Sequence, residues 1–143
     1  MVSALIKGQT NSARKYSFFN MKVIGVGGVF LRCRQLEQTR AWYAKHLGIQ
    51  MESWGAQFSH TYDPNPTAYT VLSFFKEDAE YFAPSSTGFM LNLRVDDLDG
   101  LVAQLRADGV TLVGEPVSED YGKFAWVLDP EGNKIELWEQ PLG

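Results

Sequence analysis

The stretch FAWVLDPEGNKIELWE, residues 124–139, decides the fold, and the other elements are identified by working outward from it along the chain. Residues 124–128 and 134–138 are predicted to be strands. Between them, DPEGN at 129–133 is a strong turn, because Asp, Pro, Gly and Asn are the residues that tight turns prefer. The stretch therefore predicts two neighbouring strands joined by a turn near the C-terminus.

A further strand and a helix are predicted ahead of these two strands. In residues 91–95, LNLRV, apolar and polar side chains alternate, which is the period of a half-buried strand. In residues 98–105 leucine and valine recur at i, i+3, i+4 and i+7, which predicts an amphipathic helix. Asp96 or Asp97 is placed to cap the start of this helix, and Gly109 to end it.

The N-terminal half repeats this pattern. Residues 28–49, GVFLRCRQLEQTRAWYAKHLGI, align with residues 90–110, MLNLRVDDLDGLVAQLRADGV. Each copy predicts a strand, a turn and a helix that a glycine ends, after which the chain runs back. The other predicted strands are 29–33, 56–62, 68–75 and 111–113. We therefore predict an α+β fold of two βαβββ modules, at about 21–83 and 86–140, with residues 76–88 as their linker.

The composition is that of one globular domain. The chain has 143 residues, of which 45% are hydrophobic and 21% charged, and its net charge is −4. This composition excludes a disordered protein, and the absence of a long apolar run excludes a transmembrane helix. The single cysteine, Cys33, excludes an internal disulfide framework and favours a reducing, cytoplasmic location.

The charge is spread unevenly along the chain. Residues 1–36 hold six Lys and Arg and no acid, which leaves seven bases and seventeen acids in the other 107 residues, a net charge of −10. An acidic body argues against nucleic acid as a partner, and we expect no membrane partner. Residues 1–20 are predicted to be an N-terminal extension to a domain at 21–143. An ordered arm and a transit-type presequence are the alternatives.

Three stretches together resemble the vicinal oxygen chelate superfamily, which includes glyoxalase I, extradiol dioxygenases, and fosfomycin and bleomycin resistance proteins. They are LEQTRAWYAKHLGI at 36–49, LRVDDLDGLVAQLRADGV at 93–110 and FAWVLDPEGNKIELWE at 124–139. The resemblance covers about 21–140. It implies sheets that curl into a cup holding a divalent metal and the substrate. It also implies a homodimer, which would cover the edge strands that curled sheets leave unpaired.

Most metal positions that the resemblance implies lack a ligand in this chain. Gly28 and Met90 stand where the two modules would each supply a ligand, and residues 67–75 offer only Thr, Tyr and Ser. Only Glu136 places a carboxylate at an implied position. Because about three protein ligands are the minimum for such a site, we expect no metal and no other cofactor.

The cup is predicted to be lined by side chains that alternate with the core positions of the strands. The candidate ligand-binding residues are Phe30, Arg32, Asn92, Arg94, Trp126 and Trp138, with Tyr121 at the rim and His60 on strand 56–62. Glu136 is the candidate catalytic residue, a general base with Arg94 holding an anionic group. The alternatives are that Arg94 and Glu136 form an internal ion pair and that the aromatic residues are plain core.

Three functions remain open at this point. The cup can bind a small aromatic or amphipathic molecule without metal, as bleomycin resistance proteins do. Alternatively, the chain is an enzyme, a lyase or isomerase that uses Glu136 as acid and base. The third possibility is an interaction module whose cup has collapsed. A fold does not decide between these functions, because they depend on the site.

Overall fold

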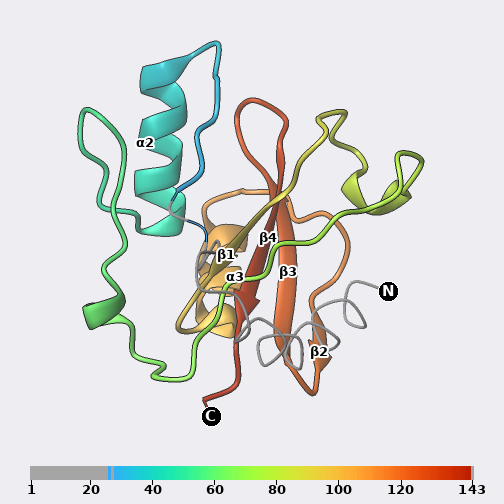
Figure 1. The fold of residues 1–143 in the computed structure, drawn as a ribbon. Helices are drawn as coiled ribbons and strands as arrows, with labels where there is room; N and C mark the ends of the chain where they lie inside the picture. Colours follow the sequence, from blue (N-terminus) through green and yellow to red (C-terminus); the bar gives the residue numbers. More distant parts are fainter. Residues whose placement is uncertain (1–25, 27, 143) are drawn as a thin grey trace, which may run out of the picture.

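A four-stranded mixed sheet forms the centre of the computed structural model, which describes residue 26 and residues 28–142 (Figure 1). The strands are β1 (Leu91–Arg94), β2 (Val117–Glu119), β3 (Gly122–Leu128) and β4 (Lys134–Glu139). Their order in the sheet is β1-β4-β3-β2. β1 runs parallel to β4, and the other two pairs are antiparallel. The predicted strands at 91–95, 124–128 and 134–138 are thus confirmed.

Two α-helices and two 3-10 turns complete the described elements. They are α2 (Leu36–Leu47), η2 (His60–Tyr62), η3 (Glu80–Phe82) and α3 (Leu98–Ala107). Asp97 caps α3 by accepting a hydrogen bond of 3.0 Å from the Gly100 N–H. Gly109 follows α3 with φ 78° and Gly48 follows α2 with φ 64°, a conformation that favours glycine. None of the described helices is long and apolar enough to cross a membrane.

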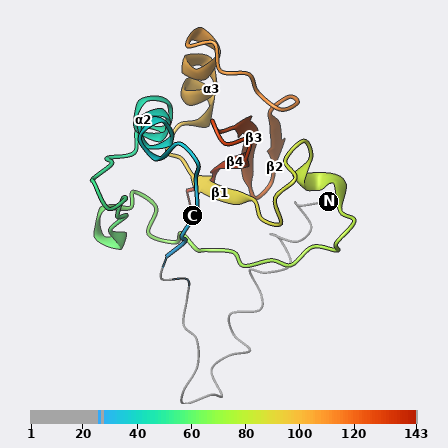
Figure 2. The same cartoon turned by 90° about the horizontal axis from the view of Figure 1, so that it is seen from above.

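The sheet has one face packed on helices and one packed on aromatic side chains. Ala125, Val127, Ile135 and Leu137 face the helices, where they join Tyr43 of α2 and Leu98, Val102 and Leu105 of α3 in one core. Phe124 and Trp138 face the other way and form a second cluster. Successive side chains of a strand point to opposite faces, so neighbouring residues enter different clusters. Figure 2 shows both helices on one side of the sheet, with the chain between η2 and η3 on the other.

The strand predictions for the N-terminal half are wrong. Among the described residues no strand precedes β1, so 29–33, 56–62 and 68–75 form no regular ladder. In 68–75 the predicted alternation is nevertheless real, since Tyr69, Val71 and Phe75 pack on the aromatic cluster while Leu72 and Phe74 are exposed. Alternation sets which side chains share a face, whereas a ladder also needs a partner strand at hydrogen-bonding distance.

Two further predictions have different outcomes. The predicted strand 111–113 is reduced to a single bridge, between Leu112 and Val127. Its neighbour Val113 donates a backbone hydrogen bond of 2.8 Å to the Trp126 carbonyl, so this segment still follows β3. The predicted extension at residues 1–20 lies outside the described residues.

Candidate functional site

The buried carboxylate of Glu136 lies at the centre of the candidate site. Glu136 is in the middle of β4 on the face opposite the helices, and it is 2% exposed. Its oxygens accept hydrogen bonds from Asn92 Nδ2 at 2.7 Å, from Trp126 Nε1 at 2.8 Å and from the Tyr81 hydroxyl. Asn92 on β1 and Trp126 on β3 both stand directly opposite Glu136 in the sheet register. Strand pairing therefore assembles most of this group.

Two residues of the site, Tyr81 and Lys134, were not predicted from the sequence. Burial, followed by the charge of Glu136, raises the pKa of the Tyr81 hydroxyl. Lys134 Nζ donates a hydrogen bond of 2.6 Å to the Tyr81 carbonyl and lies 4.8 Å from the centre of the Tyr81 ring. Burial lowers the pKa of this lysine. The period of β4 could have identified Lys134, two residues before Glu136, but nothing in the linker sequence indicated Tyr81.

Three aromatic rings form a wall beside Glu136. The Phe124 ring stacks on Trp138 with centroids 5.8 Å apart and an interplanar angle of 11°, and on Trp126 at 6.4 Å and 15°. Phe124 and Trp138 are direct neighbours in the sheet register. We call Phe124, Trp126 and Trp138 the aromatic wall. Its near-parallel ring planes share one orientation, which suits another ring that packs in the same orientation.

Tyr121 completes one end of the aromatic wall. Its carbonyl accepts a hydrogen bond of 3.0 Å from Trp138 Nε1, and its ring lies 5.8 Å from that of Phe124. The Tyr121 hydroxyl is enclosed and has no hydrogen-bond partner among the described residues. An enclosed hydroxyl without a partner is costly, so this end of the wall offers a hydrogen bond to an incoming group.

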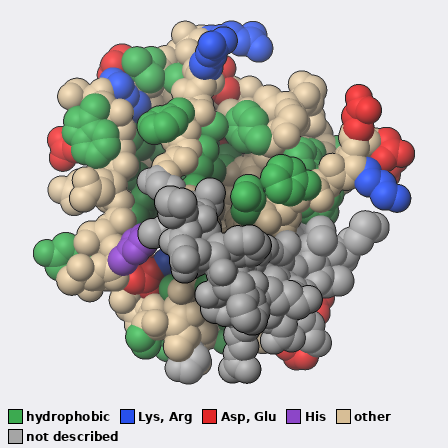
Figure 3. Space-filling view, in the orientation of Figure 1, with side chains coloured by type: hydrophobic (Ala, Val, Ile, Leu, Met, Phe, Trp, Pro, Cys, Tyr) green, Lys and Arg blue, Asp and Glu red, His purple; other side chains and the backbone are tan. Residues whose placement is uncertain are grey.

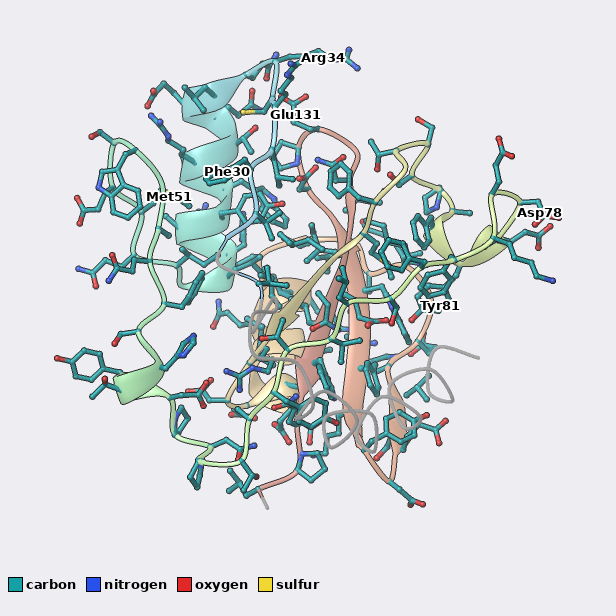
Figure 4. All side chains as sticks on the ribbon, viewed as in Figure 1. Phe30, Arg34, Met51, Asp78, Tyr81 and Glu131 are labelled. Carbon is teal, nitrogen blue, oxygen red and sulfur yellow. The ribbon has the colours of Figure 1, made fainter. Side chains whose placement is uncertain are left out.

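The aromatic wall is covered by the chain itself. Tyr69, Val71, Phe75 and Tyr81 pack against it, and the Tyr69 ring meets Trp138 edge-on at 5.5 Å. We call residues 69–81 the covering segment. In Figure 1 it crosses in front of the sheet as a lime-green line, and Figure 4 shows Tyr81 lying inward while Asp78 points outward. The site face is thus filled with aromatic side chains from the covering segment.

Arg94 lies on the same face of the sheet but pairs with a residue other than Glu136. Its guanidinium binds the carboxylate of Asp63, which follows η2. Hydrogen bonds from Arg94 and from the Asn65 backbone hold the pKa of Asp63 below its usual range. The structure therefore contains no ion pair between Arg94 and Glu136, which the sequence had left open as an alternative.

The other predicted residues lie in several places. Asn92, Trp126 and Trp138 surround Glu136, and Tyr121 is at the rim, as described above. Phe30 lies beside α2 and is 97% exposed (Figure 4). His60 begins η2 and is exposed. Arg32 lines a different cavity, at the start of α2. The structure thus brings together the predicted residues of the second half and separates those of the first.

The residues around Glu136 do not fit a divalent metal ion. The three groups that contact its carboxylate are an amide N–H, an indole N–H and a phenol, and N–H groups cannot be ligands. Within residues 28–142, no group of three His, Cys, Asp or Glu side chains is placed to hold a metal ion. No step through a metal is therefore derived for this site.

Comparisons with solved structures show the same fold. An integron cassette protein from V. cholerae is 21% identical, with a TM-score of 0.55, over 85% of this chain and 98% of its own. An antibiotic binding protein from Streptomyces sp. CB03234 is 20% identical, with a TM-score of 0.51, over 85% and 100%. Lactoylglutathione lyase from Agrobacterium tumefaciens is 16% identical, with a TM-score of 0.50, over 80% and 94%. No curated protein matches the sequence significantly.

A family model also matches most of the chain. It covers residues 25–137 and describes the Glyoxalase/Bleomycin resistance protein/Dioxygenase superfamily. The match includes Phe124, Trp126, Glu136 and both helices, and it ends one residue before Trp138. It confirms the resemblance found in the sequence and, with the solved structures, the fold class. The chain belongs to the Glyoxalase/Bleomycin resistance protein/Dioxygenase superfamily.

Proposed function

We propose that this protein binds a small planar aromatic or amphipathic molecule against the aromatic wall, without a metal. The observation that carries the proposal is the parallel arrangement of Phe124, Trp126 and Trp138 beside a carboxylate whose oxygens already have donors. Flat rings stacked at one angle favour a flat ligand, and a few fixed polar groups orient it.

The covering segment would give way to such a ligand. Its Tyr69 and Phe75 rings occupy the place of a flat ligand on the aromatic wall. Among the described residues it joins no regular sheet ladder, and its Tyr69 carbonyl is held by the Gln140 side chain at 3.1 Å. A ligand ring that replaces Tyr69 or Phe75 restores the lost ring contacts, and the Tyr121 hydroxyl supplies a hydrogen bond.

The similar fold of an antibiotic binding protein supports binding as the function. The alternative, a lyase or isomerase, requires Glu136 to take up a proton on a carboxylate oxygen. Tyr81, Asn92 and Trp126 all donate to those oxygens, and their hydrogen bonds favour a carboxylate that stays in place. The contacts of Glu136 therefore favour a role in fixing Tyr81, Asn92 and Trp126 beside the aromatic wall over a role in proton transfer.

A fluorescence titration tests the proposal. The probe is 1-anilinonaphthalene-8-sulfonate, an amphipathic molecule with a flat naphthalene ring, and the variant is Trp126→Leu. We expect the probe to bind and the variant to weaken binding about tenfold, a change of about 1.4 kcal/mol. Trp54→Leu is the matched control, because Trp54 is 66% exposed and is not among the residues that pack on the cluster of Phe124 and Trp138. Equal binding by both variants would contradict the proposal, and no binding at all would favour the collapsed cup.

We also propose that two copies of the chain form a homodimer. Large apolar side chains of the N-terminal half are exposed, including Phe30 at 97% and Phe74 at 86%. Figure 3 shows hydrophobic side chains gathered across the upper part of one face. In the described structure β1 is an edge strand, with β4 as its one neighbour. A symmetric pair covers such a surface and such an edge with one self-complementary patch.

Light scattering tests the homodimer. At micromolar concentration the mass should be near twice 16.1 kDa. Deletion of residues 1–20 should leave the dimer largely intact if those residues are an accessory. A stable monomer across the concentration range would contradict the proposal, and a monomer only after the deletion would make residues 1–20 the principal contact.

A further inference from the structure

A separate cavity lies where the chain entering α2 meets the turn between β3 and β4. Its volume is about 310 Å³, and its lining includes Arg32, Arg34, Thr87 and Phe89. A volume of this size lies at the lower end of the range for small-molecule sites. Neither Glu136 nor any residue of the aromatic wall lines it, so it is distinct from the site proposed above.

The cavity carries positive charge in an otherwise acidic body. Neither Arg32 nor Arg34 forms an ion pair with a described residue, whereas Arg40, Arg94 and Arg106 each pair with an acid. A guanidinium presents its N–H groups as a fork that matches the two oxygens of a carboxylate or phosphate. Two guanidinium groups in the lining of one cavity therefore favour the binding of an anion.

The one acid of the lining is already engaged. Glu131 Oε1 accepts a hydrogen bond of 2.9 Å from the Gln35 backbone N–H, directly before α2, which has no side-chain cap of its own. Figure 4 shows Arg34 and Glu131 at this same end of the molecule. With two guanidiniums and one carboxylate, the lining keeps an excess of one positive charge.

An apolar surface lies beside the charges. Phe89 is 38% exposed and lines the cavity together with Thr87. A bare inorganic ion would leave this ring unused, whereas a ligand with an apolar body would cover it. We infer that the cavity binds a small organic anion, an aryl carboxylate or aryl phosphate whose charged end contacts Arg32 and Arg34 and whose ring contacts Phe89.

The only cysteine of the chain lines the same cavity and serves as its reporter. Alkylation of Cys33 is followed with two reagents of similar size, the anionic iodoacetate and the neutral iodoacetamide. The ratio of their rates isolates recognition of charge, since a change in thiol reactivity affects both reagents. The variant is Arg32→Gln/Arg34→Gln. The control is Lys45→Gln/Arg106→Gln, which removes the same charge outside the cavity.

We expect the iodoacetate-to-iodoacetamide ratio to fall about tenfold in Arg32→Gln/Arg34→Gln, which corresponds to about 1.4 kcal/mol, and to change little in the control. Phenyl phosphate and benzoate should each slow alkylation of the unmodified protein by iodoacetamide, and inorganic phosphate much less. The relative effects of the first two identify the preferred headgroup. Trp126→Leu should leave this protection unchanged, which separates the inference from the proposed binding at the aromatic wall.

Three results would overturn the inference. The first is an unchanged rate ratio in Arg32→Gln/Arg34→Gln. The second is the absence of protection by millimolar phenyl phosphate and benzoate, which is measured on the unmodified protein and so does not depend on the variant folding. The third is a Cys33 that reacts with neither reagent in the native protein, because the cavity would then be closed.

Discussion

The hydroxyl of Tyr43, in α2, donates a hydrogen bond of 2.7 Å to Oδ2 of Asp129, in the turn between β3 and β4. The two residues are 86 positions apart and both are buried. Asp129 also accepts hydrogen bonds from the Asn133 backbone and side chain, at 2.8 and 3.0 Å. One carboxylate therefore closes the turn and fixes α2 against the sheet.

We expect Tyr43→Phe to lower the free energy of unfolding by about 1–3 kcal/mol, because Asp129 then loses a donor in a buried position. Urea unfolding followed by circular dichroism measures the change. Tyr62→Phe is the matched control, since Tyr62 is 86% exposed. Equal stabilities for the two variants would show that the bond contributes little.

The buried Tyr43 hydroxyl is also expected to make the folded protein less stable at alkaline pH. Burial, and then Asp129, raises the pKa of Tyr43 above its usual value of 10.0. The folded state therefore favours the protonated hydroxyl. This stability is fully present below the pKa of the unfolded chain and is lost as the pH rises above about 10. Unfolding measured between pH 8 and 11 should show a shallower decline in Tyr43→Phe than in the unmodified protein. The same slope in both would contradict this origin.

Glu136→Gln should lower the free energy of unfolding by about 1–3 kcal/mol. An amide in place of the carboxylate brings an NH₂ group toward Asn92, Trp126 and Tyr81, which all donate to Glu136. Either one donor then faces another donor or the Asn92 amide turns over to present its Oδ1, and in both cases the charge that strengthens these hydrogen bonds is lost. Thermal unfolding compares this variant with Glu115→Gln, whose side chain is 88% exposed. A Glu136→Gln protein as stable as its control would rule out the hydrogen-bonded carboxylate described here.

Gly122 is expected to tolerate no side chain. Its φ is 135°, and a Cβ there would overlap the Glu139 carbonyl and the Trp138 indole. Gly114 has φ 73° with open space around it, so Gly114→Ala meets the backbone strain without the overlap. We expect Gly122→Ala to cost about 1–3 kcal/mol more than Gly114→Ala, measured by urea unfolding. Comparable losses would mean that Trp138 shifts at little cost.

The Arg94–Asp63 ion pair is expected to make a contribution to stability that is lost at low pH. Arg94 holds the pKa of Asp63 below its usual value of 3.8. A lowered pKa stabilises the fold at pH values above the usual one, and this contribution is lost as the pH falls through the lowered value. Arg94→Gln should therefore flatten the decline in thermal stability between pH 5 and 2. Arg40→Gln is the control, because Arg40 pairs with the exposed Glu37. If both variants decline alike, Asp63 does not contribute in this way.

Much of the second half could be predicted from its sequence. The two strands around 129–133 are joined by a short turn, so their pairing is local, and their register brings Trp126 opposite Glu136. The period of two in 91–95 placed Asn92 on the face that carries Glu136. Helix α3 and its Asp97 cap also depend on neighbouring residues only. Local physics determines these features, and the sequence predicts them for that reason.

The partners of several side chains were decided by the path of the chain in space. Tyr81 reaches Glu136 across 55 positions, and Arg94 reaches Asp63 across 31. Neither contact follows from a period or a motif, because each depends on where a loop crosses the sheet. The unpaired segments 29–33 and 56–62 failed as predicted strands for the same reason, since alternation shows which side chains share a face but not which backbone lies beside them.

The sequence by itself determined the two helices, the strands β1, β3 and β4, the superfamily and the carboxylate at the centre of the candidate site, whereas β2 was not predicted. Only the tertiary structure decided what surrounds that carboxylate and what covers the aromatic wall. It also separated Arg32 from Glu136 and placed it with Arg34 at another cavity. The physical reason is the range of the forces involved: turn, cap and strand preferences act between neighbours in the chain, whereas burial and hydrogen bonding act between whichever groups the folded chain brings together.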